Sequence, residues 1–553
     1  MILLCATQIC HAQIFQGAMP LSYNHVDLIE DNGVPTINLV VPDVNTLVVQ
    51  DLADTRADAI WRDAVALVVN AGISDDGFGL WYDLGSLGKV WKLRLKANGA
   101  VSMELNFDEF SIPNGAILTI YNPEHTNHLG GYTSLNNKDF SSLSTHMIQG
   151  DECIVEYYIP TGVGVNGSLH IKDIAYRYKD VLRIDDGGGS QSCEIDVNCA
   201  EGTNWVNAKK STVRIRSRIG DDFFWSSGAL VNNTGQDCKP FILSSFRTTI
   251  NPHNLEFSSF EDFQYYRFYF NYERSECVEG VGLDKSISGA YMRTNSNDNG
   301  GEQGSDFILF ELSTDIPEAY NVYWSGWNTL DNPEAFSGVC IHHPMGDVKK
   351  ISTFNSVPVS ANYGISNTHW KVLWDETESG KGVTEIGSNG APLFDEEGRI
   401  FGTLTAGGSS CEEEFPGGSE NPDFFGKMNK HWIENPNPIP LKLRSWLDPA
   451  ATGLSLFDGS LNPCVVGIES ESFLENMKMY PNPANSYVII SQDEGFEGSI
   501  LVFDQRGKLV VSKDISTQST YRIDISHLRN GMYFLELILD EGASRHSKLL
   551  IQR

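Results

Sequence analysis

Hydrophobic and polar residues alternate along the first third of the chain. Apolar side chains occupy every second position from Trp91 to Leu95 and from Val101 to Phe107, with charged or polar residues between them. Successive side chains of a strand point to opposite faces, so this period of two predicts strands with one buried and one polar face. Further strands are predicted over 116–121, 153–159 and 169–178. Such a succession of strands favours an antiparallel sandwich of two sheets.

The remainder of the chain also has a β-pattern. Residues 193–459 contain short apolar runs separated by Gly and Asn turns, with little helical periodicity, which is typical of a pair of β-barrels. Residues 479–553 alternate again and have the length of a small sandwich. We therefore predict an all-β protein with an N-terminal sandwich (20–184), a central domain (193–459), a linker (460–478) and a C-terminal domain (479–553). The Gly-rich, acidic stretch 185–192 is expected to be a flexible joint.

Composition narrows the choice of partners and of compartment. The net charge of -32, from 40 Lys and Arg against 72 Asp and Glu, would repel nucleic acid and anionic lipid headgroups. No run of 18 apolar residues is present, so no transmembrane segment is expected. Residues 1–12 resemble the end of an export signal, ending in Cys10, His11 and Ala12, and we interpret them as a truncated signal peptide rather than a first strand. Export would permit disulfides.

The loop around Gly387 carries the first chemical signal. Its sequence GVTEIGSNGAP has the framework of a serine-protease nucleophile loop, with Asn389 where the nucleophile should stand. Five further segments share this resemblance in collinear order: SCEIDVNCAEG, SGALVNNT, GSDFILFEL, VYWSGWN followed by CIHHP, and WLDPAATG. Together they resemble the bacterial lysyl endopeptidases, which are trypsin-like serine proteases, over residues 193–459.

The resemblance implies a trypsin-like double β-barrel in which a Ser attacks the substrate carbonyl, a His takes its proton and a buried Asp orients the His. Asp306 in GSDFILFEL stands at the position of the triad Asp, Arg247 in PFILSSFRTT at that of the His, and Asn389 at that of the Ser. Arginine stays protonated and cannot act as a base, and an amide is not a usable nucleophile. We therefore expect a lost reaction, with Arg247 and Asp306 forming an internal salt bridge.

A relocated catalytic group is the competing interpretation. Ser388 and His253 are the neighbours that could replace the missing nucleophile and base. By its position in the family loop, Ser388 is expected to point away from the substrate, and His253 lies six residues beyond the base position. With either residue recruited, the chain would be an active serine endopeptidase that cleaves after Lys or Arg.

The resemblance also implies a specificity pocket. Asp423 stands where the family has the Asp that holds a substrate lysine, and Thr405 and Tyr363 correspond to the pocket-side His and Trp. A buried carboxylate at this place could bind a basic side chain of a peptide. The alternative is that Asp423 is solvated or paired within the protein.

Two disulfides follow from the same resemblance. It implies bridges between Cys193 and Cys411 and between Cys199 and Cys277, while both ends of a third family bridge are replaced, by Ser226 and Thr248. Connectivity of the other cysteines does not follow from sequence. The cysteines left without an assigned partner after loss of the signal peptide are Cys153, Cys238, Cys340 and Cys464.

The flanking regions resemble known domains as well. The N-terminal sandwich, with FSIPNGAILTIYN and GDECIVEYY, is similar to the pro-domain of such proteases in secreted Bacteroidota proteins, which implies a chaperone or accessory role. The C-terminal domain, with YPNPA, VFDQRGKLV and IDISHLRNGMYFLEL, resembles the sorting domain of the type IX secretion system, a small Ig-like sandwich. This implies the secretion machinery as a partner, passage through the periplasm, and release or anchoring at the cell surface.

The sequence thus predicts a secreted or cell-surface serine protease homologue that has lost proteolysis and binds basic peptides or has a structural role. A surface adhesin or carbohydrate-binding protein built on the N-terminal sandwich is a third possibility. No cofactor is expected. Asn295, Asn297, Asn299, Gly300 and Asp306 have the spacing of a calcium loop, but its first three ligand positions lack carboxylates, so no metal site is predicted.

Overall fold

The structure is a computed structural model of the chain. It describes residues 19–25, 33–53, 60–74, 78–179, 189–277, 279–280, 285–332, 335–411, 421–435, 437–464, 477–505, 507–539 and 544–553. The predicted signal peptide lies outside these residues, as do half of the predicted joint and most of the linker. Within the described ranges, no helix combines the length and apolar character needed to cross a membrane.

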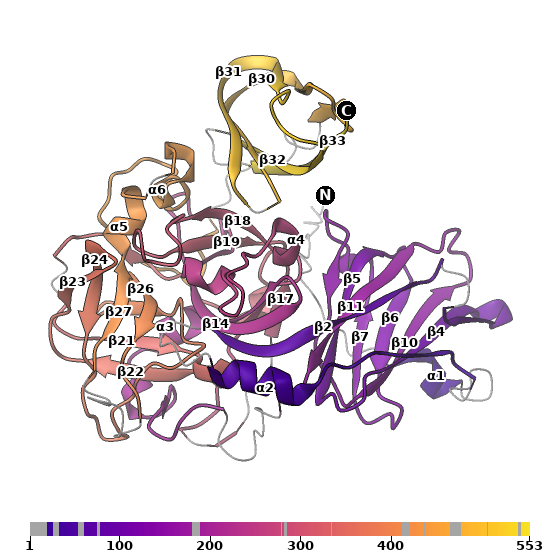
Figure 1. The fold of residues 1–553 in the computed structure, drawn as a ribbon, viewed down its shortest axis with the longest axis horizontal. Helices are drawn as coiled ribbons and strands as arrows, with labels where there is room; N and C mark the ends of the chain where they lie inside the picture. The colour runs from indigo at the N-terminus through magenta and orange to yellow at the C-terminus, as the bar shows by residue number, and fades with distance from the viewer. Residues whose placement is uncertain are drawn as a thin grey trace, which may run out of the picture.

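Two sheets packed face to face form the N-terminal unit (Figure 1). Their facing sides bury a common core that includes Trp91, Leu105 and Tyr157. Every strand expected from the alternation is present, and the all-β class is confirmed. The first sheet contains β1 (Thr36–Asn38), β3 (Leu80–Asp83), β4 (Gly88–Lys96), β6 (Ile117–Tyr121), β7 (His128–Tyr132) and β10 (Glu152–Pro160), and the second contains β2 (Trp61–Gly72), β5 (Ser102–Ser111), β8 (Leu143–Ser144), β9 (Ile148–Gln149) and β11 (Ser168–Arg177).

The second sheet continues beyond the N-terminal unit. Strand β2, which the alternation did not predict, pairs with β14 (Asp222–Leu230) of the central unit in antiparallel register, with Val65 opposite Asp222. The result is a 12-stranded sheet shared by the two units. In Figure 1, β2 lies between β14 on one side and β11 on the other. Backbone hydrogen bonds therefore join the N-terminal unit to the central one.

The polar face of this sheet is buried as well, which corrects the expectation of a single buried face. Glu104 on β5 is 1% exposed and Asp63 on β2 is 0% exposed. The central unit covers both residues and presents Arg216, from β13 (Thr212–Ile219), 2.6 Å from the Glu104 carboxylate and 3.1 Å from that of Asp63. Charged groups can be buried when they are paired in this way.

The central unit divides between two sheets, as a double barrel requires. One core, with Ile215 and Phe310, lies in the first half, and another, with Phe354 and Trp370, lies in the second. The first half contains β13, β14, β15 (Phe241–Ser244), β16 (Arg267–Phe270), β17 (Lys285–Ser288), β18 (Ala290–Asn295) and β19 (Ile308–Leu312), and the second contains β12 (Ile195–Asp196), β20 (Trp327–Asn328), β21 (Gly338–His342), β22 (Lys350–Phe354), β23 (Val359–Tyr363), β24 (Ile365–Val372), β25 (Pro392–Asp395), β26 (Ile400–Gly407), β27 (Asp423–Lys427) and β28 (Leu456–Phe457).

The C-terminal unit is a five-stranded sheet that curls around its own core, which includes Val502, Leu535 and Leu549. It sits above β18 and α4 of the central unit in Figure 1. Its strands are β29 (Lys478–Tyr480), β30 (Tyr487–Phe503), β31 (Leu509–Asp524), β32 (Gly531–Leu539) and β33 (Ser544–Ile551).

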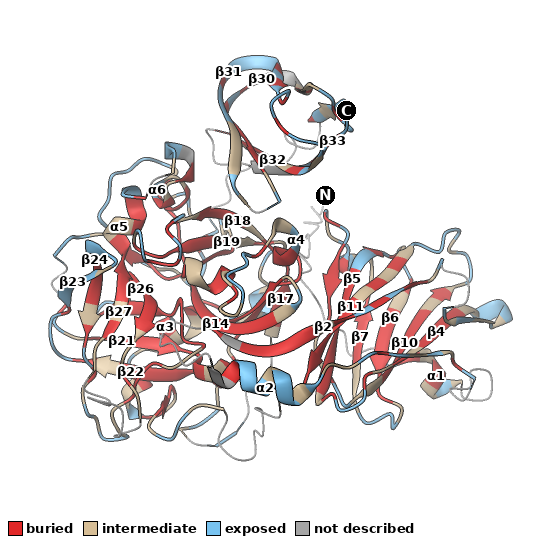
Figure 2. Ribbon diagram, in the orientation of Figure 1, coloured by how far each residue is buried: buried red, intermediate tan, exposed pale blue. Residues whose placement is uncertain are grey.

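Helices are few and short in the described part of the chain. Figure 2 shows buried residues concentrated in the strands, whereas α2 is exposed along much of its length. The α-helices are α1 (Leu21–Asn24), α2 (Val44–Ala53), α3 (Val206–Ser211), α4 (Phe260–Phe263), α5 (Met428–Ile433) and α6 (Leu443–Leu447).

Three disulfides link cysteines in the described part of the chain. Cys193 is bonded to Cys411 and Cys199 to Cys277, which are the two pairs that the resemblance implied. The third joins Cys238 to Cys464, a pair that the sequence left unassigned, and it fixes the start of the linker to the first half of the central unit. Cys153 and Cys340 are reduced and buried.

Candidate functional site

Asp306 and Arg247 lie together at the edge of the first half of the central unit. Strand β15 leads into a single turn of 3-10 helix, η5 (Phe246–Thr249), and Asp306 precedes β19, which pairs with β15. One carboxylate oxygen of Asp306 accepts the backbone N–H of Arg247 at 3.0 Å, and the other accepts the Ser245 hydroxyl at 2.5 Å. The Arg247 guanidinium donates to the Gly300 carbonyl. Asp306 thus contacts Arg247 through the backbone amide rather than through the side-chain salt bridge that we expected.

A second buried carboxylate, that of Asp298, fixes the backbone of Asp306. Asp298, which is 1% exposed, accepts the backbone N–H of Asp306 at 2.8 Å and the Ser296 hydroxyl at 2.6 Å. These bonds hold Asp306 in a left-handed conformation (φ +60°), which is unfavourable for a residue with a Cβ. Burial raises the pKa of Asp306 to about 6, with a further contribution from Asp298, although Arg247 opposes both.

Asp306 is expected to make stability depend on pH between about 4 and 6. The folded protein keeps this proton after the unfolded chain, with an ordinary pKa of about 3.9, has released it. The free energy of unfolding should therefore fall as the pH rises through this window, by an amount on the order of 2–3 kcal/mol. Asp306→Asn should remove that part of the slope in urea unfolding curves recorded at several pH values. A variant that kept the wild-type pH profile would contradict this assignment.

Asn389 is buried in the nucleophile loop. It is 2% exposed, and its side-chain amide donates to the backbone carbonyl of Thr405 on β26 at 3.0 Å. The Thr405 hydroxyl lies 3.0 Å from Nε2 of His369 on β24, and the Tyr363 ring packs against His369 in a tilted arrangement at a centroid distance of 5.0 Å. The structure therefore brings the predicted residues Asn389, Thr405 and Tyr363 together, and adds His369, which the sequence did not single out.

The segment that precedes Asp306 packs onto this cluster. A Cβ atom added to Gly301 would lie 2.8 Å from the Thr405 methyl and 3.2 Å from Cβ of Asp306, and one added to Gly300 would lie 3.2 Å from Cβ of Arg247. Glycine is required at this approach because both positions also have a positive φ. Residues 298–304, which we call the glycine lid, thus pack against Arg247, Asp306 and Thr405.

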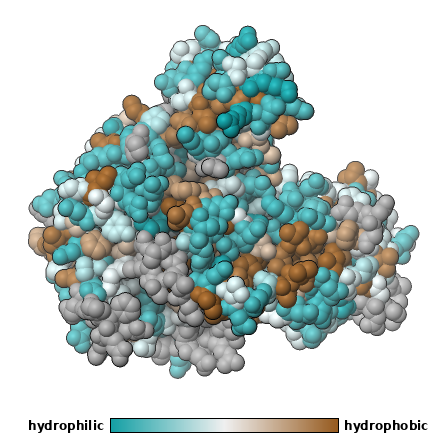
Figure 3. All heavy atoms as spheres, in the orientation of Figure 1, coloured by the Kyte–Doolittle hydropathy of each residue, from teal (hydrophilic) through white to brown (hydrophobic). Residues whose placement is uncertain are grey.

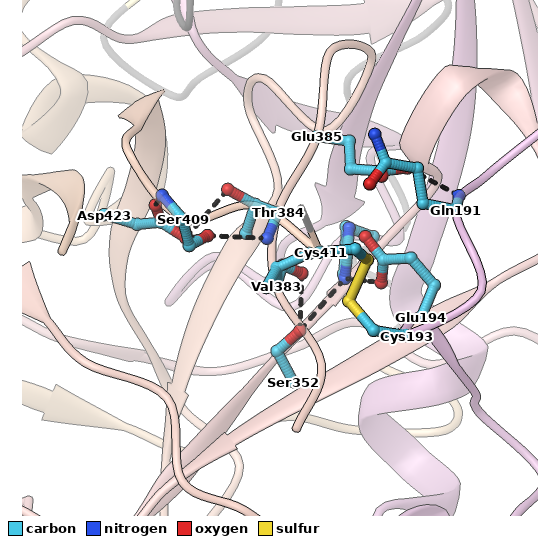
Figure 4. Close-up of a disulfide and its surroundings, with 11 residues drawn as sticks. Gln191, Cys193, Glu194, Ser352, Val383, Thr384, Glu385, Ser409, Cys411 and Asp423 are labelled. Carbon is cyan, nitrogen blue, oxygen red and sulfur yellow. Dashed lines mark hydrogen bonds and ion pairs between the residues drawn. A yellow bond between two sulfur atoms is a disulfide. The ribbon is translucent and has the colours of Figure 1, made fainter. Parts of the chain in front are cut away.

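A second hydrogen-bonded chain lies beneath the nucleophile loop. The Ser388 hydroxyl is 2.7 Å from Nδ1 of His342 on β21, and Nε2 of His342 is 3.6 Å from the Glu194 carboxylate. Figure 4 shows Glu194 beside the Cys193–Cys411 disulfide. Burial lowers the pKa of His342 to about 3 and raises that of Glu194 well above its ordinary value. His342 is therefore neutral at physiological pH, which a general base must be, but Ser388 and His342 are both 0% exposed.

Asp423 is satisfied by its own chain. Its carboxylate accepts five hydrogen bonds, and Figure 4 shows Thr384 and Ser409 beside it. The donors are the Trp374 indole (2.6 Å), the hydroxyls of Thr384 (2.8 Å) and Ser409 (2.7 Å), and the backbone N–H groups of Gly408 (2.8 Å) and Ser409 (3.0 Å). The side chain is 0% exposed. Internal pairing, one of the two alternatives for Asp423, is what the structure contains.

Several partners in this site were not found from the sequence. No motif marks Ser245, Asp298 or His369 themselves, and only the fold brings them to the predicted residues. Asp298 does fall within the stretch that has calcium-loop spacing, but at a position that spacing does not use. Within the described residues, no group of three or more His, Cys, Asp and Glu side chains is placed to hold a metal ion.

Comparison with known proteins identifies two parts of the chain. Residues 187–426 match the family model for the lysyl endopeptidase C-terminal domain, and residues 478–552 match that for the secretion system C-terminal sorting domain. The lysyl endopeptidase of Pseudomonas aeruginosa is 25% identical over 298 residues, which are 51% of this chain. The match spans 60% of that relative's length.

Solved structures with some likeness include two proteases. The active form of the Rv3671c protease of M. tuberculosis is 12% identical, with a TM-score of 0.27, over 43% of this chain and 84% of its own. A thermostable serine protease from an extremophilic microorganism is 13% identical, with a TM-score of 0.29, over 40% of this chain and 91% of its own. From the family matches, the chain joins a domain of the lysyl endopeptidase type, related to the trypsin-like serine proteases, to a C-terminal sorting domain that implies export by type IX secretion.

Proposed function

We propose that this protein is delivered to the cell surface or beyond, and that its central unit acts there without hydrolysing peptide bonds. The observation that carries the proposal is the pair of residues at the base and nucleophile positions, Arg247 and Asn389. A permanently protonated guanidinium cannot accept the proton of a nucleophile, and an amide cannot replace a hydroxyl. In this proposal, residues 1–12 are a signal peptide and residues 460–478 link the central unit to the sorting domain.

The contacts of these residues support a structural role. Asn389 donates to the Thr405 carbonyl and the Arg247 guanidinium to the Gly300 carbonyl, so both contribute to internal packing. The glycine lid lies against Arg247 and Thr405, where a peptide substrate would need to approach. Asp306 is likewise engaged by Ser245 and the Arg247 backbone. Two further bonds cross between the halves: the Thr403 hydroxyl donates to the Asp306 carbonyl at 3.2 Å, and the Ser227 N–H donates to the Asn389 carbonyl at 2.9 Å. We infer that the inherited site now serves to hold the two halves of the central unit together.

Ser388 is the best candidate for a relocated nucleophile, because its hydroxyl is hydrogen-bonded to a neutral histidine. Burial argues against this alternative, since a substrate carbonyl would have to reach an atom that has no exposed surface. His253, the other stand-in, lies 3.6 Å from Asp51 of the N-terminal unit and stacks on Phe224. It therefore belongs to the contact between the two units.

Two binding functions remain as alternatives, capture of a basic peptide at Asp423 and binding of a carbohydrate on the N-terminal sandwich. With five internal donors on Asp423, we favour a structural role for this carboxylate over capture of a basic peptide. A cavity of about 330 Å³ at one end of the N-terminal sandwich is lined by Trp81, Tyr82 and Lys89 among others. The Lys89 ammonium lies over the Trp81 ring at 4.8 Å, so that this ring face is covered rather than offered to a sugar.

The test of the proposal is direct. Purified full-length protein is expected to hydrolyse neither lysyl nor arginyl amide substrates above the buffer rate, and to remain unlabelled by a fluorophosphonate probe. A trypsin-like protease in the same assay serves as the positive control. Ser388→Ala is the matched variant, because it removes only the candidate relocated nucleophile. Labelling of the wild type that is absent in Ser388→Ala would establish the competing interpretation instead.

A further inference from the structure

The sorting domain makes an aromatic contact with the central unit. The ring of Phe260 on α4 lies 4.7 Å from the ring of Phe534 on β32 and 5.6 Å from that of Phe503 on β30. Leu441 of the central unit is buried in the same cluster, together with Leu501 and Phe503. Figure 3 shows a largely hydrophilic surface at the far end of the sorting domain. Phe503 and Phe534 of the sorting domain thus face the central unit.

A buried ion pair lies beside this aromatic contact. Arg293 on β18 is 2.7 Å from the carboxylate of Glu536 on β32 and 2.6 Å from that of Glu311 on β19. The side chains of Arg293 and Glu536 are each 3% exposed. The guanidinium is therefore shared between a carboxylate of its own unit and one of the sorting domain, away from water. Removing one partner of such a pair strongly weakens the association, because the other charge is left buried without a counter-charge.

The two faces of β32 make different contacts, one with the core of the sorting domain and the other with the central unit. Tyr533, Leu535 and Leu537 belong to the core of the sorting domain. Phe534, Glu536 and Ile538 point the opposite way, because side chains of a strand alternate, and they meet the central unit. The strand thus presents an aromatic, an acidic and an aliphatic residue to an acceptor face made of Phe260, Arg293 and Leu441.

We propose that this acceptor face binds the sorting domain independently of the covalent linker, so that cutting the chain between Cys464 and Met477 leaves the two parts associated. The Cys238–Cys464 disulfide keeps the upstream end of such a cut attached to the central unit. While the linker is intact, a weak contact is enough to keep the sorting domain docked, because the effective concentration of the domain is on the order of millimolar. After a cut, the contact itself must supply the affinity. A desolvated arginine–carboxylate pair beside clustered aromatic rings has the features of an interface hot spot, which supports association without the link.

The experiment uses the full chain with a site-specific protease sequence inserted between Cys464 and Met477. After cleavage, the wild-type fragments are expected to co-elute in gel filtration at micromolar concentration. Glu536→Arg should weaken their association by at least about 30-fold, because it places a second cation beside Arg293. Asp514→Arg reverses an exposed charge on β31 of the same domain and should leave the fragments together.

Two outcomes would overturn the proposal: separation of the wild-type fragments, or co-elution of the Glu536→Arg fragments with wild-type affinity. Phe534→Ala is a second, independent test of the same contact. This half-buried residue lies outside the core of the sorting domain, and its truncation should also release the fragment. Circular dichroism of each uncut variant verifies that the sorting domain is folded.

Discussion

Replacing Asp63 with alanine is expected to lower the free energy of unfolding by about 3–5 kcal/mol, because two buried arginines would lose their shared carboxylate. Asp63 is 0% exposed and lies 2.8 Å from Arg177 of its own unit and 3.1 Å from Arg216 of the central unit. Strand β2, which carries it, also joins the two units through its pairing with β14. We therefore expect the N-terminal and central units to unfold in a single urea transition, and this transition should move to lower urea concentration in the variant.

The matched control is Asp108→Ala on β5, a carboxylate whose side chain is 37% exposed and whose partner is His170. It should cost less than about 1 kcal/mol, because solvent screens exposed pairs. Burial disfavours the ionised form of Asp63, but Arg177 and Arg216 outweigh it and hold the pKa of Asp63 below its ordinary value. The stability that Asp63 provides is present above about pH 4 and lost below it, so the wild-type advantage should shrink in acid. Equal losses for Asp63→Ala and Asp108→Ala would show that the buried network does not couple the units.

The strands of the N-terminal unit could be predicted because local alternation reports the two faces of a strand. Alternation does not report what covers the polar face. Glu104 is 1% exposed because Arg216, which lies 112 residues further along the chain, reaches it across the boundary between the units. Only the tertiary arrangement determines whether such a polar face meets water or a second set of charges. The same limit explains why β2 was missed as the joining strand.

For the site, the resemblance identified positions but not their partners. Asp306 and Asn389 were located by motif, and the structure places each in a buried hydrogen-bonded setting. Their contacts with Ser245, Asp298 and Thr405 depend on how β15, β19 and β26 are juxtaposed, which no motif encodes. The Cys238–Cys464 bridge shows the same limit, since its cysteines are separated by 226 residues and belong to no recognised pattern.

Asp423→Ala is expected to destabilise the protein by about 3–5 kcal/mol, since it would leave several buried donors without an acceptor. The wild-type carboxylate accepts the Trp374 indole, the Ser409 hydroxyl and backbone N–H, and two further donors. Each orphaned donor keeps its desolvation cost of about 1–3 kcal/mol, although the hydroxyls can turn to other acceptors and reduce the total. The measurement is urea unfolding of the wild type and the variant at neutral pH.

This substitution also separates the two roles that a carboxylate at the base of a pocket can have. Glu376→Ala removes a nearby exposed carboxylate and should change stability by less than about 0.5 kcal/mol. If Asp423 is structural, the wild type should show no measurable affinity for lysyl peptides, and Asp423→Ala should change stability alone. If Asp423 is instead a cation pocket, the variant should lose affinity for those peptides while remaining nearly as stable as the wild type, because a carboxylate that serves a ligand keeps acceptor lone pairs free for it. The five internal hydrogen bonds lead us to expect the first result, in which Asp423 holds β27 to the segments that contain Trp374, Thr384 and Ser409.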